Sequence, residues 1–310
     1  MPVPVDDEKE ALFQAIRGGS CVAFVGSGPS RSAYPRWPDL VDRLCGACGV
    51  EPLTAEGRED ADILLGKAEE CREANEAAYC DVLTAAFGTE VYDIPRIYSQ
   101  LAKLQFRSYV TTNFDPMLRT ALDSIPEKCD GVYVYPDLPV QKIGRGRLFH
   151  IHGLMAPGAV LNVDRIVLAK ADFERAYSHE YSMVRSFLAQ LFTYNSCCFI
   201  GIGLREPELR RLFLACAAVR RKLQYDWPDL TPPRHYALLP MLYRRAGGPP
   251  GVRDLDAEAI EARTFDELGV NVVRYQPLDD RHLGLIQLLD ECLELLTVPI
   301  RSGFEPENIK

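Results

Sequence analysis

The chain has 310 residues, of which 47% are hydrophobic and 25% are charged, and its formal net charge is −9. This length supports one large domain or two modest ones with a well-buried core. The acidic balance argues against nucleic acid as a partner, and no apolar run approaches the roughly 20 residues of a membrane helix, so no membrane partner is expected.

Ten cysteines are scattered along the chain, several of them inside apolar runs. This usage is typical of free buried thiols in a reducing cytosol. Together with an acidic N-terminus that lacks the pattern of a signal peptide, it predicts a cytoplasmic protein. One CxxC pair occurs, Cys45 and Cys48, but a zinc site of the ribbon type needs a second pair, so we expect no bound metal.

The first predicted elements are a helix over residues 7–17 and a buried strand over the apolar run 21–25. The strand ends in Gly26, Ser27 and Gly28. Glycines permit close approach to the backbone, and free N–H groups before a helix can hold a phosphate. However, Arg31 stands where the usual dinucleotide fingerprint has a third glycine. A phosphate loop and an ordinary tight strand-to-helix turn therefore both remain open.

The next predicted elements are mostly helical. Pro38 lies at a helix start, residues 59–87 have the pattern of two helices, and residues 94–104 form an amphipathic helix. The β-rich run 108–115 then predicts a strand. Its polar residues come at the carboxyl end: Thr112, Asn113 and Asp115.

The second half of the chain alternates strands and helices. A strand over 148–151 ends at His152 and Gly153, and a strand over 197–200 ends at Gly201 and Gly203. The other elements expected are strands near 132–134 and 165–168, a helix from about 181 to 194, a helix starting near 206, strands at 235–239 and 270–275, and a final helix ending near 296.

This alternation predicts an α/β fold, a Rossmann-like and mostly parallel sheet with helices on both faces. We expect a single domain over residues 1–310, with a helical module within about 55–105 and a C-terminal tail at 297–310. In such sheets ligands bind outside the carboxyl ends of the strands. The turn 26–28, the segment 112–115 and His152 should therefore converge.

Several motifs occur in the order found in sirtuins. They are Gly26-Ser27-Gly28-x-Ser30, Pro35-Arg36-Trp37-x-x-Leu40, Thr111-Thr112-Asn113-Phe114-Asp115, His152-Gly153 and Gly201-Ile202-Gly203. On these residues the chain resembles the SIR2-like (sirtuin-fold) family, especially its bacterial antiphage-defence NADase branch, over residues 8–296. Gly201 to Leu209 also fits the Gly-x-x-x-x-x-Pro-x-Leu segment of that branch.

The resemblance implies a role for each matching residue, with NAD⁺ as the substrate. Gly26, Ser27, Gly28 and Ser30 would hold the pyrophosphate and the adjacent ribose, and Trp37 would stand at the pocket wall or in the core. Asn113 and Asp115, with Thr112, would line the nicotinamide-ribose pocket, and His152 would be the catalytic histidine. Gly201, Gly203 and, more weakly, Asn271 would approach the adenosine.

The chemistry fits these residue types. Breaking the bond between ribose C1′ and nicotinamide develops positive charge on the sugar, as in glycoside cleavage. Asp115 would stabilise that charge or hold the nicotinamide amide. Asn113 offers a donor and an acceptor, and a histidine with a pKa near its ordinary value of about 6.5 can take a proton at neutral pH. A structural alternative stays open, in which Asn113 and Asp115 only cap the next helix and His150 only fills the core.

Protein-deacylating sirtuins carry a zinc module with two cysteine pairs, whereas this chain has one pair and a helical stretch. The resemblance therefore favours water as the acceptor and implies an NAD⁺ glycohydrolase that releases nicotinamide and ADP-ribose. It also implies a homo-oligomer with a defence-system partner protein or a phage trigger. The alternatives are an NAD-dependent protein deacylase and a non-catalytic sensor of NAD or ADP-ribose.

Overall fold

The computed structural model describes residues 5–88, 93–178, 182–204, 206–243, 253–278 and 282–297. The expected tail beyond residue 297 lies outside these ranges, as does the predicted start near 181 of the helix that ends at Tyr194.

A seven-stranded sheet forms the centre of the molecule, with strand order β3-β4-β2-β1-β5-β6-β7 and parallel pairing between all neighbours. The α/β class with a parallel sheet is thereby confirmed. The strands are β1 (Cys21–Val25), β2 (Tyr109–Thr111), β3 (Gly131–Val134), β4 (Arg147–His150), β5 (Ser196–Ile200), β6 (His235–Pro240) and β7 (Val270–Tyr275).

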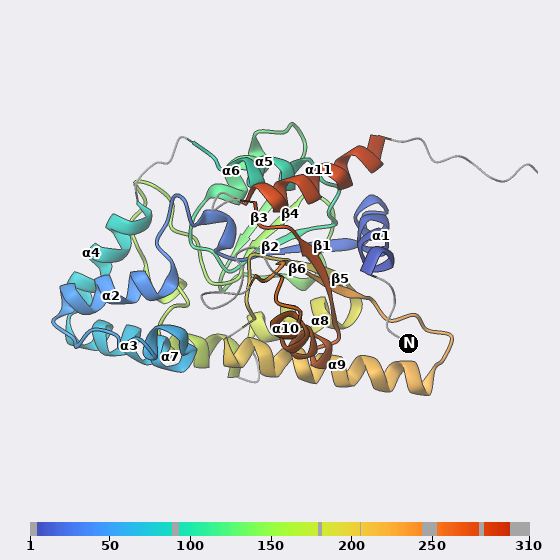
Figure 1. Cartoon of the computed structure of the whole chain (residues 1–310). Coiled ribbons are helices and arrows are strands. Elements are labelled where there is room, and N and C mark those ends of the chain that lie inside the picture. Colours follow the sequence, from blue (N-terminus) through green and yellow to red (C-terminus); the bar gives the residue numbers. More distant parts are fainter. Residues whose placement is uncertain are drawn as a thin grey trace, which may run out of the picture.

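Helices cover both faces of the sheet (Figure 1). One face carries α1 (Val5–Arg17), α5 (Arg96–Lys103), α6 (Met117–Asp123) and α11 (Leu283–Thr297), and the other carries α8 (Met183–Tyr194), α9 (Pro207–Asp226) and α10 (Leu255–Glu267). The central strand β1 contributes side chains to the hydrophobic core on both faces of the sheet. Cys21, Ala23 and Val25 join one core cluster, and Val22 and Phe24 join the other. This is why its five residues are all apolar and all buried.

A helical module stands beside the sheet and consists of α2 (Trp37–Cys48), α3 (Ala61–Ala74), α4 (Glu76–Phe87) and the short α7 (Lys170–Phe173) (Figure 1). The predicted pair of helices in 59–87 is confirmed. Asn75 ends the first helix, where its backbone N–H donates to Cys71, and its side chain caps the second by accepting from the Ala78 N–H. The module differs from the expected range in two ways. It includes α2, and α5 packs instead against α6 and α11 on the sheet.

The strand predicted at 165–168 is wrong. A 3₁₀ turn covers Val163–Arg165, and the following residues are buried without joining the sheet. The N–H of Val167 donates to the carbonyl of His152, 2.9 Å away, so the segment packs over the loop that follows β4. The apolar residues correctly indicated burial here, but burial alone does not show that a segment pairs with the sheet.

Candidate active site

The carboxyl ends of four strands lie side by side at one edge of the sheet. Val25 of β1 pairs with Thr111 of β2 and with Ile200 of β5, and Thr111 pairs with His150 of β4. The residues that follow these strand ends therefore share one edge, as the sequence predicted. They include Gly26, Thr112, His152 and Gly201.

The glycine turn after β1 packs directly on the turn after β5. The N–H of Gly26 donates to Ile200 and that of Gly28 donates to Gly201, at 2.9 and 3.0 Å. A Cβ on Gly26 would lie 2.6 Å from the carbonyl oxygen of Gly201, and a Cβ on Gly28 would lie 2.7 Å from its Cα. These glycines are thus required by backbone packing between two turns, besides any contact with a ligand.

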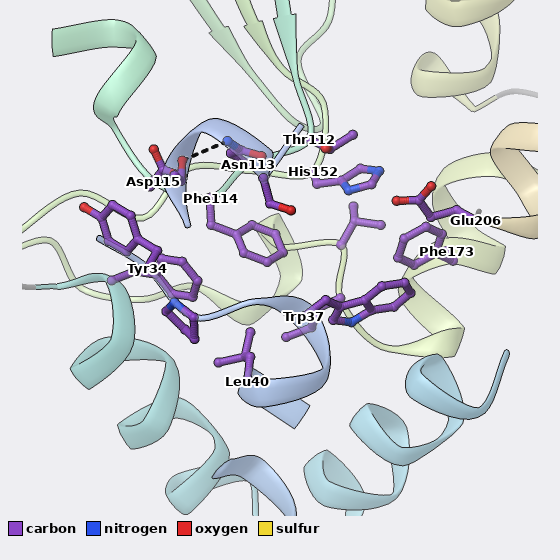
Figure 2. Close-up of a pocket in the computed structure, with 16 residues that line it drawn as sticks. Tyr34, Trp37, Leu40, Thr112, Asn113, Phe114, Asp115, His152, Phe173 and Glu206 are labelled. Atoms are coloured by element: carbon purple, nitrogen blue, oxygen red, sulfur yellow. Dashed lines mark hydrogen bonds between the residues drawn. The ribbon is translucent and has the colours of Figure 1, made fainter. Parts of the chain in front are cut away.

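A pocket opens in front of these turns (Figure 2). Figure 2 shows Tyr34 on the side of Asp115, and Trp37 and Phe173 on the side of Glu206. Seven of the predicted site residues line this pocket: Ser27, Ser30, Trp37, Thr112, Asn113, Asp115 and His152. The other residues that line it are Tyr34, Pro35, Leu40, Phe87, Phe114, Val167, Leu168, Phe173 and Glu206.

Five predicted nucleotide-binding residues lie outside the pocket lining. Gly26, Gly28 and Gly201 form the packed turns behind it, and Gly203 is exposed at the next bend. Asn271 is elsewhere, because it is the second residue of β7 and its side-chain amide donates to the carbonyl of His235, 3.1 Å away. It lies near the amino end of an edge strand, so the geometry does not support its assignment to this pocket.

A buried hydrogen-bond network joins two of the catalytic candidates, Asn113 and Asp115. Ser30 Oγ donates to Asp115 Oδ2 at 2.8 Å and lies 2.5 Å from the hydroxyl of Tyr98. The Nδ2 group of Asn113 lies within hydrogen-bond distance of three oxygens: the Gly26 carbonyl at 3.0 Å, the Tyr98 hydroxyl at 3.2 Å and Ser30 Oγ at 3.3 Å. Since the Gly26 carbonyl can only accept, the amide nitrogen of Asn113 must lie on this side, and its Oδ1 is turned the other way.

Asp115 is both a helix cap and a member of the network. Its Oδ1 accepts from the N–H of Met117 at the start of α6, and its Oδ2 accepts from Ser30. Burial raises the pKa of Asp115 to about 6, against the opposing effect of these hydrogen bonds. Asp115 therefore does cap the helix, as the structural alternative expected. It is also a carboxylate with a perturbed pKa at the pocket wall.

His152 is enclosed by aromatic rings. Phe173 and Tyr177 lie edge-on to its imidazole, with centroids 5.1 and 5.8 Å away, and its Nε2 lies 2.5 Å from the Tyr177 hydroxyl. Burial lowers the pKa of His152 to about 3. The sequence-based expectation of an ordinary pKa near 6.5 is wrong, because the strand end that exposes the residue to the pocket also places it under these rings.

The neighbouring His150 has a structural role, as expected. It is fully buried, and its Nδ1 lies 3.3 Å from the backbone carbonyl of Asn113. Burial lowers its pKa to about 4. His150 thus supports the segment that carries Asn113 without reaching the pocket.

Three polar atoms in the pocket wall are buried and have no hydrogen-bond partner among the described residues: Tyr34 Oη, Trp37 Nε1 and Asn113 Oδ1. Each carries a donor or acceptor that folding has taken from water, which costs about 1–3 kcal/mol per group unless a ligand or water pairs with it. Trp37 supplies a donor, Asn113 an acceptor, and Tyr34 either. The wall is therefore suited to a ligand that carries both kinds of polar group beside a flat apolar surface.

Several residues of the site could not be assigned from sequence reasoning. Tyr98 lies on the amphipathic α5, Phe173 is the last residue of α7, and Tyr177 lies in the turn after it, so their patterns resembled core positions. Glu206 offered a signal that could have been used. It follows the glycines after β5 and precedes the first residue of α9, which is a ligand-facing place in this class of sheet.

Cys45 and Cys48 face Cys71 of α3, with the sulfur of Cys71 3.7 Å from that of Cys45. All ten cysteines are free thiols. Across the described ranges, no group of three or more His, Cys, Asp or Glu residues is arranged to hold a metal ion. In the same part of the chain, none of the helices is long and apolar enough to cross a membrane.

Comparisons with known proteins place this geometry in context. The chain is 24% identical to the "NAD(+) hydrolase ThsA" of Bacillus cereus (strain MSX-D12) over 226 residues, which are 72% of this chain and 43% of that protein. A solved chain from "Structural Basis for the Mechanism and Regulation of Sir2 Enzymes" superposes with a TM-score of 0.43 at 11% identity, covering 93% of this chain and 98% of the other.

The family model described as "SIR2-like domain" matches residues 107–245. That segment contains Asn113, Asp115, His152, Tyr177 and Glu206, whereas the glycine turn after β1 precedes it. The match thus covers strands β2 to β6 and the pocket residues that follow β2, β4 and β5.

Proposed function

We propose that the protein is an NAD⁺ glycohydrolase that cleaves the bond between nicotinamide and ribose to give nicotinamide and ADP-ribose. The observation that carries this proposal is the convergence of Asn113, Asp115 and His152 on one pocket at the carboxyl edge of a parallel sheet. The similarity to a NAD⁺ hydrolase supports it, although the aligned region spans 43% of that protein's length.

The reaction breaks the bond from C1′ to the nicotinamide nitrogen, and the electron pair leaves with nicotinamide. The oxygen of water forms the new bond to C1′, and one of its protons is released. Positive charge develops on the ribose in between, and the buried carboxylate of Asp115 would stabilise it at short range. The unpaired Oδ1 of Asn113 would accept a hydrogen bond from a ribose hydroxyl or from the attacking water.

The substrate's remaining groups have candidate partners around the pocket. Ser27 and Ser30 line it beside the glycine turn. The N–H groups of Gly26 and Gly28 donate to the turn after β5, so the exposed Ser27 hydroxyl would face the pyrophosphate. Trp37 offers its unpaired N–H and a flat apolar face. No metal is part of this proposal.

The biological setting is proposed from the family resemblance. An enzyme that consumes NAD⁺ in the cytoplasm must be held inactive until it is needed. We therefore expect a homo-oligomer whose activity depends on a defence-system partner protein or a phage trigger.

The test is incubation of the purified full chain with NAD⁺, with and without the product of a neighbouring gene, and chromatography of the products. Nicotinamide and ADP-ribose should appear in equal amounts, and the release should be lost in His152→Ala and Asn113→Ala. Asn195→Ala is the matched control, because Asn195 lies at the amino end of β5. Release that survives both site variants would overturn the assignment.

Two other outcomes point to different functions. Nicotinamide release that needs an added acetylated peptide would indicate a deacylase. Binding of NAD⁺ without turnover, unaffected by His152→Ala, would indicate a sensor.

A further inference from the structure

The contact between His152 and Tyr177 is the closest one that either side chain makes in the site. The Tyr177 hydroxyl lies 2.5 Å from His152 Nε2, and both residues are buried. Tyr177 belongs to a single π-helical turn, Glu174–Ser178, and its ring stacks on Phe173 with centroids 5.5 Å apart and an interplanar angle of 13°. Single π-helical turns are rare and occur often at functional sites.

The direction of this hydrogen bond follows from counting hydrogens. A phenol has one O–H, and within the described residues the Tyr177 hydroxyl has His152 Nε2 as its only hydrogen-bond partner. If Nε2 carried a proton and donated it, the phenolic O–H would be left buried without an acceptor, which is costly. Donation from Tyr177 to Nε2 satisfies both groups and leaves the ring proton on Nδ1.

The charge states agree with this direction. Burial raises the pKa of Tyr177 well above its ordinary value, and the charges of Glu206 and Glu208 raise it further, so the phenol keeps its proton. Burial keeps the imidazole of His152 neutral at neutral pH. A neutral imidazole has one donor and one acceptor nitrogen, and Tyr177 occupies the acceptor.

We propose that Tyr177 is a positioning residue that fixes His152 as its Nδ1–H tautomer, so that His152 meets the substrate as a hydrogen-bond donor and not as a base. The effect on catalysis rests on the proposed NAD⁺ cleavage, whereas the tautomer itself rests only on the contact between Tyr177 and His152. The matching group on the substrate is an acceptor, such as a ribose hydroxyl oxygen.

The roles of the acid–base groups change as a result. With Nε2 occupied, the proton released by the attacking water must go to another group at the pocket wall. Asp115 and Glu206 are the carboxylates that line the pocket, and Figure 2 shows the Glu206 carboxylate directed toward the His152 ring. With a pKa of about 6, Asp115 is a better proton acceptor near neutral pH than a histidine with a pKa of about 3.

The tautomer of His152 can be determined by NMR, without any measurement of enzymatic activity. In the full chain labelled with ¹⁵N-histidine, a two-bond ¹H–¹⁵N correlation spectrum separates the protonated from the unprotonated ring nitrogen of each of the five histidines. The His152 signals are assigned by their loss in His152→Asn. We expect His152 to show a protonated Nδ1 and an unprotonated Nε2, and Tyr177→Phe to shift population toward the Nε2–H form. A protonated Nε2 in the unmodified chain would overturn the proposal.

Measurements of activity test the role of Tyr177 independently. Hydrogen bonds that orient a functional histidine typically contribute about 10- to 100-fold, so Tyr177→Phe should lower kcat by about this factor with little change in KM. Tyr109→Phe is the matched control, because it also removes a buried tyrosine hydroxyl, one that bonds to the carbonyls of Leu101 and Leu104 away from the pocket.

A second pair of variants covers the case in which Tyr177→Phe does not fold. The amide nitrogen of asparagine lies where Nδ1 lies in histidine, whereas that of glutamine reaches the place of Nε2. His152→Asn should therefore retain more activity than His152→Gln. The reverse order would contradict the donor role. A chain with the expected tautomer but no NAD⁺ cleavage would refute the proposed function and leave the tautomer assignment intact.

Discussion

Ser30 Oγ donates a hydrogen bond to Asp115 Oδ2 across 2.8 Å and so joins the turn after β1 to the turn after β2. Both side chains are buried. The bond ties a residue expected to face the phosphates and ribose to the carboxylate expected to stabilise the sugar cation. It also opposes the effect of burial on the Asp115 pKa. In the proposed function, binding and chemistry would thus depend on the same contact.

Ser30→Ala should move the acidic limb of the pH–rate profile. Loss of the hydrogen bond removes one of the effects that lower the Asp115 pKa, so the pKa rises above its present value of about 6. A smaller fraction of the carboxyl is then ionised at each pH, and the limb of kcat/KM shifts to higher pH. Ser32→Ala, a change at an exposed neighbour, should leave the limb in place. A limb that stays fixed or moves to lower pH in Ser30→Ala would refute this account.

Asp115→Asn should stabilise the fold while it lowers nicotinamide release. The folded chain keeps a proton on Asp115 up to about pH 6, whereas the unfolded chain releases it near the ordinary value of 3.8. Stability therefore falls as the pH rises between these values, and the ionised group costs about 3 kcal/mol at pH 7. The neutral amide avoids that cost.

Urea denaturation should show Asp115→Asn to be more stable by about 1–3 kcal/mol at pH 7 and nearly equal to the parent at pH 4. Nicotinamide release should drop by about 10²- to 10³-fold, the usual effect of losing one preorganised electrostatic group. A variant that is less stable at pH 7, or that retains its activity, would contradict the assignment.

His150→Asn should make the protein less sensitive to acid. Burial holds the pKa of His150 near 4, so the folded chain stays neutral there while the unfolded chain binds a proton below about pH 6.5. Stability is lost as the pH falls through this window, at about 1.4 kcal/mol per pH unit. Asparagine removes the titration but keeps an N–H for the carbonyl of Asn113.

The measurement is the free energy of unfolding in urea at pH 6.5 and 5.5 for both proteins. His152 and His235 also have lowered pKa values, and Asp115 has the opposite dependence, but these groups are common to both chains and cancel in the comparison. Equal losses in the two proteins would show that His150 does not stay neutral in the folded state.

Much of the fold could be predicted because burial leaves a direct mark on sequence. The runs 21–25 and 197–200 are apolar throughout, since a central parallel strand packs on both faces. Once the sheet was predicted to be parallel, the rule that strands present their carboxyl ends to ligands brought Asn113, Asp115 and His152 together. The same burial signal failed at 165–168, because it does not say whether a strand edge is available.

What only the tertiary structure decided are the relations between residues distant in the chain. Tyr98 and Tyr177 look like core residues in sequence, yet the hydroxyl of each lies within hydrogen-bond distance of a candidate catalytic side chain. Asn271 looked suitable by type, but its register in β7 puts it toward the amino end of the sheet. Residue types and strand order determine which groups can reach the pocket edge. Their pKa values, hydrogen-bond partners and tautomers depend on desolvation and contacts that form only when the chain folds.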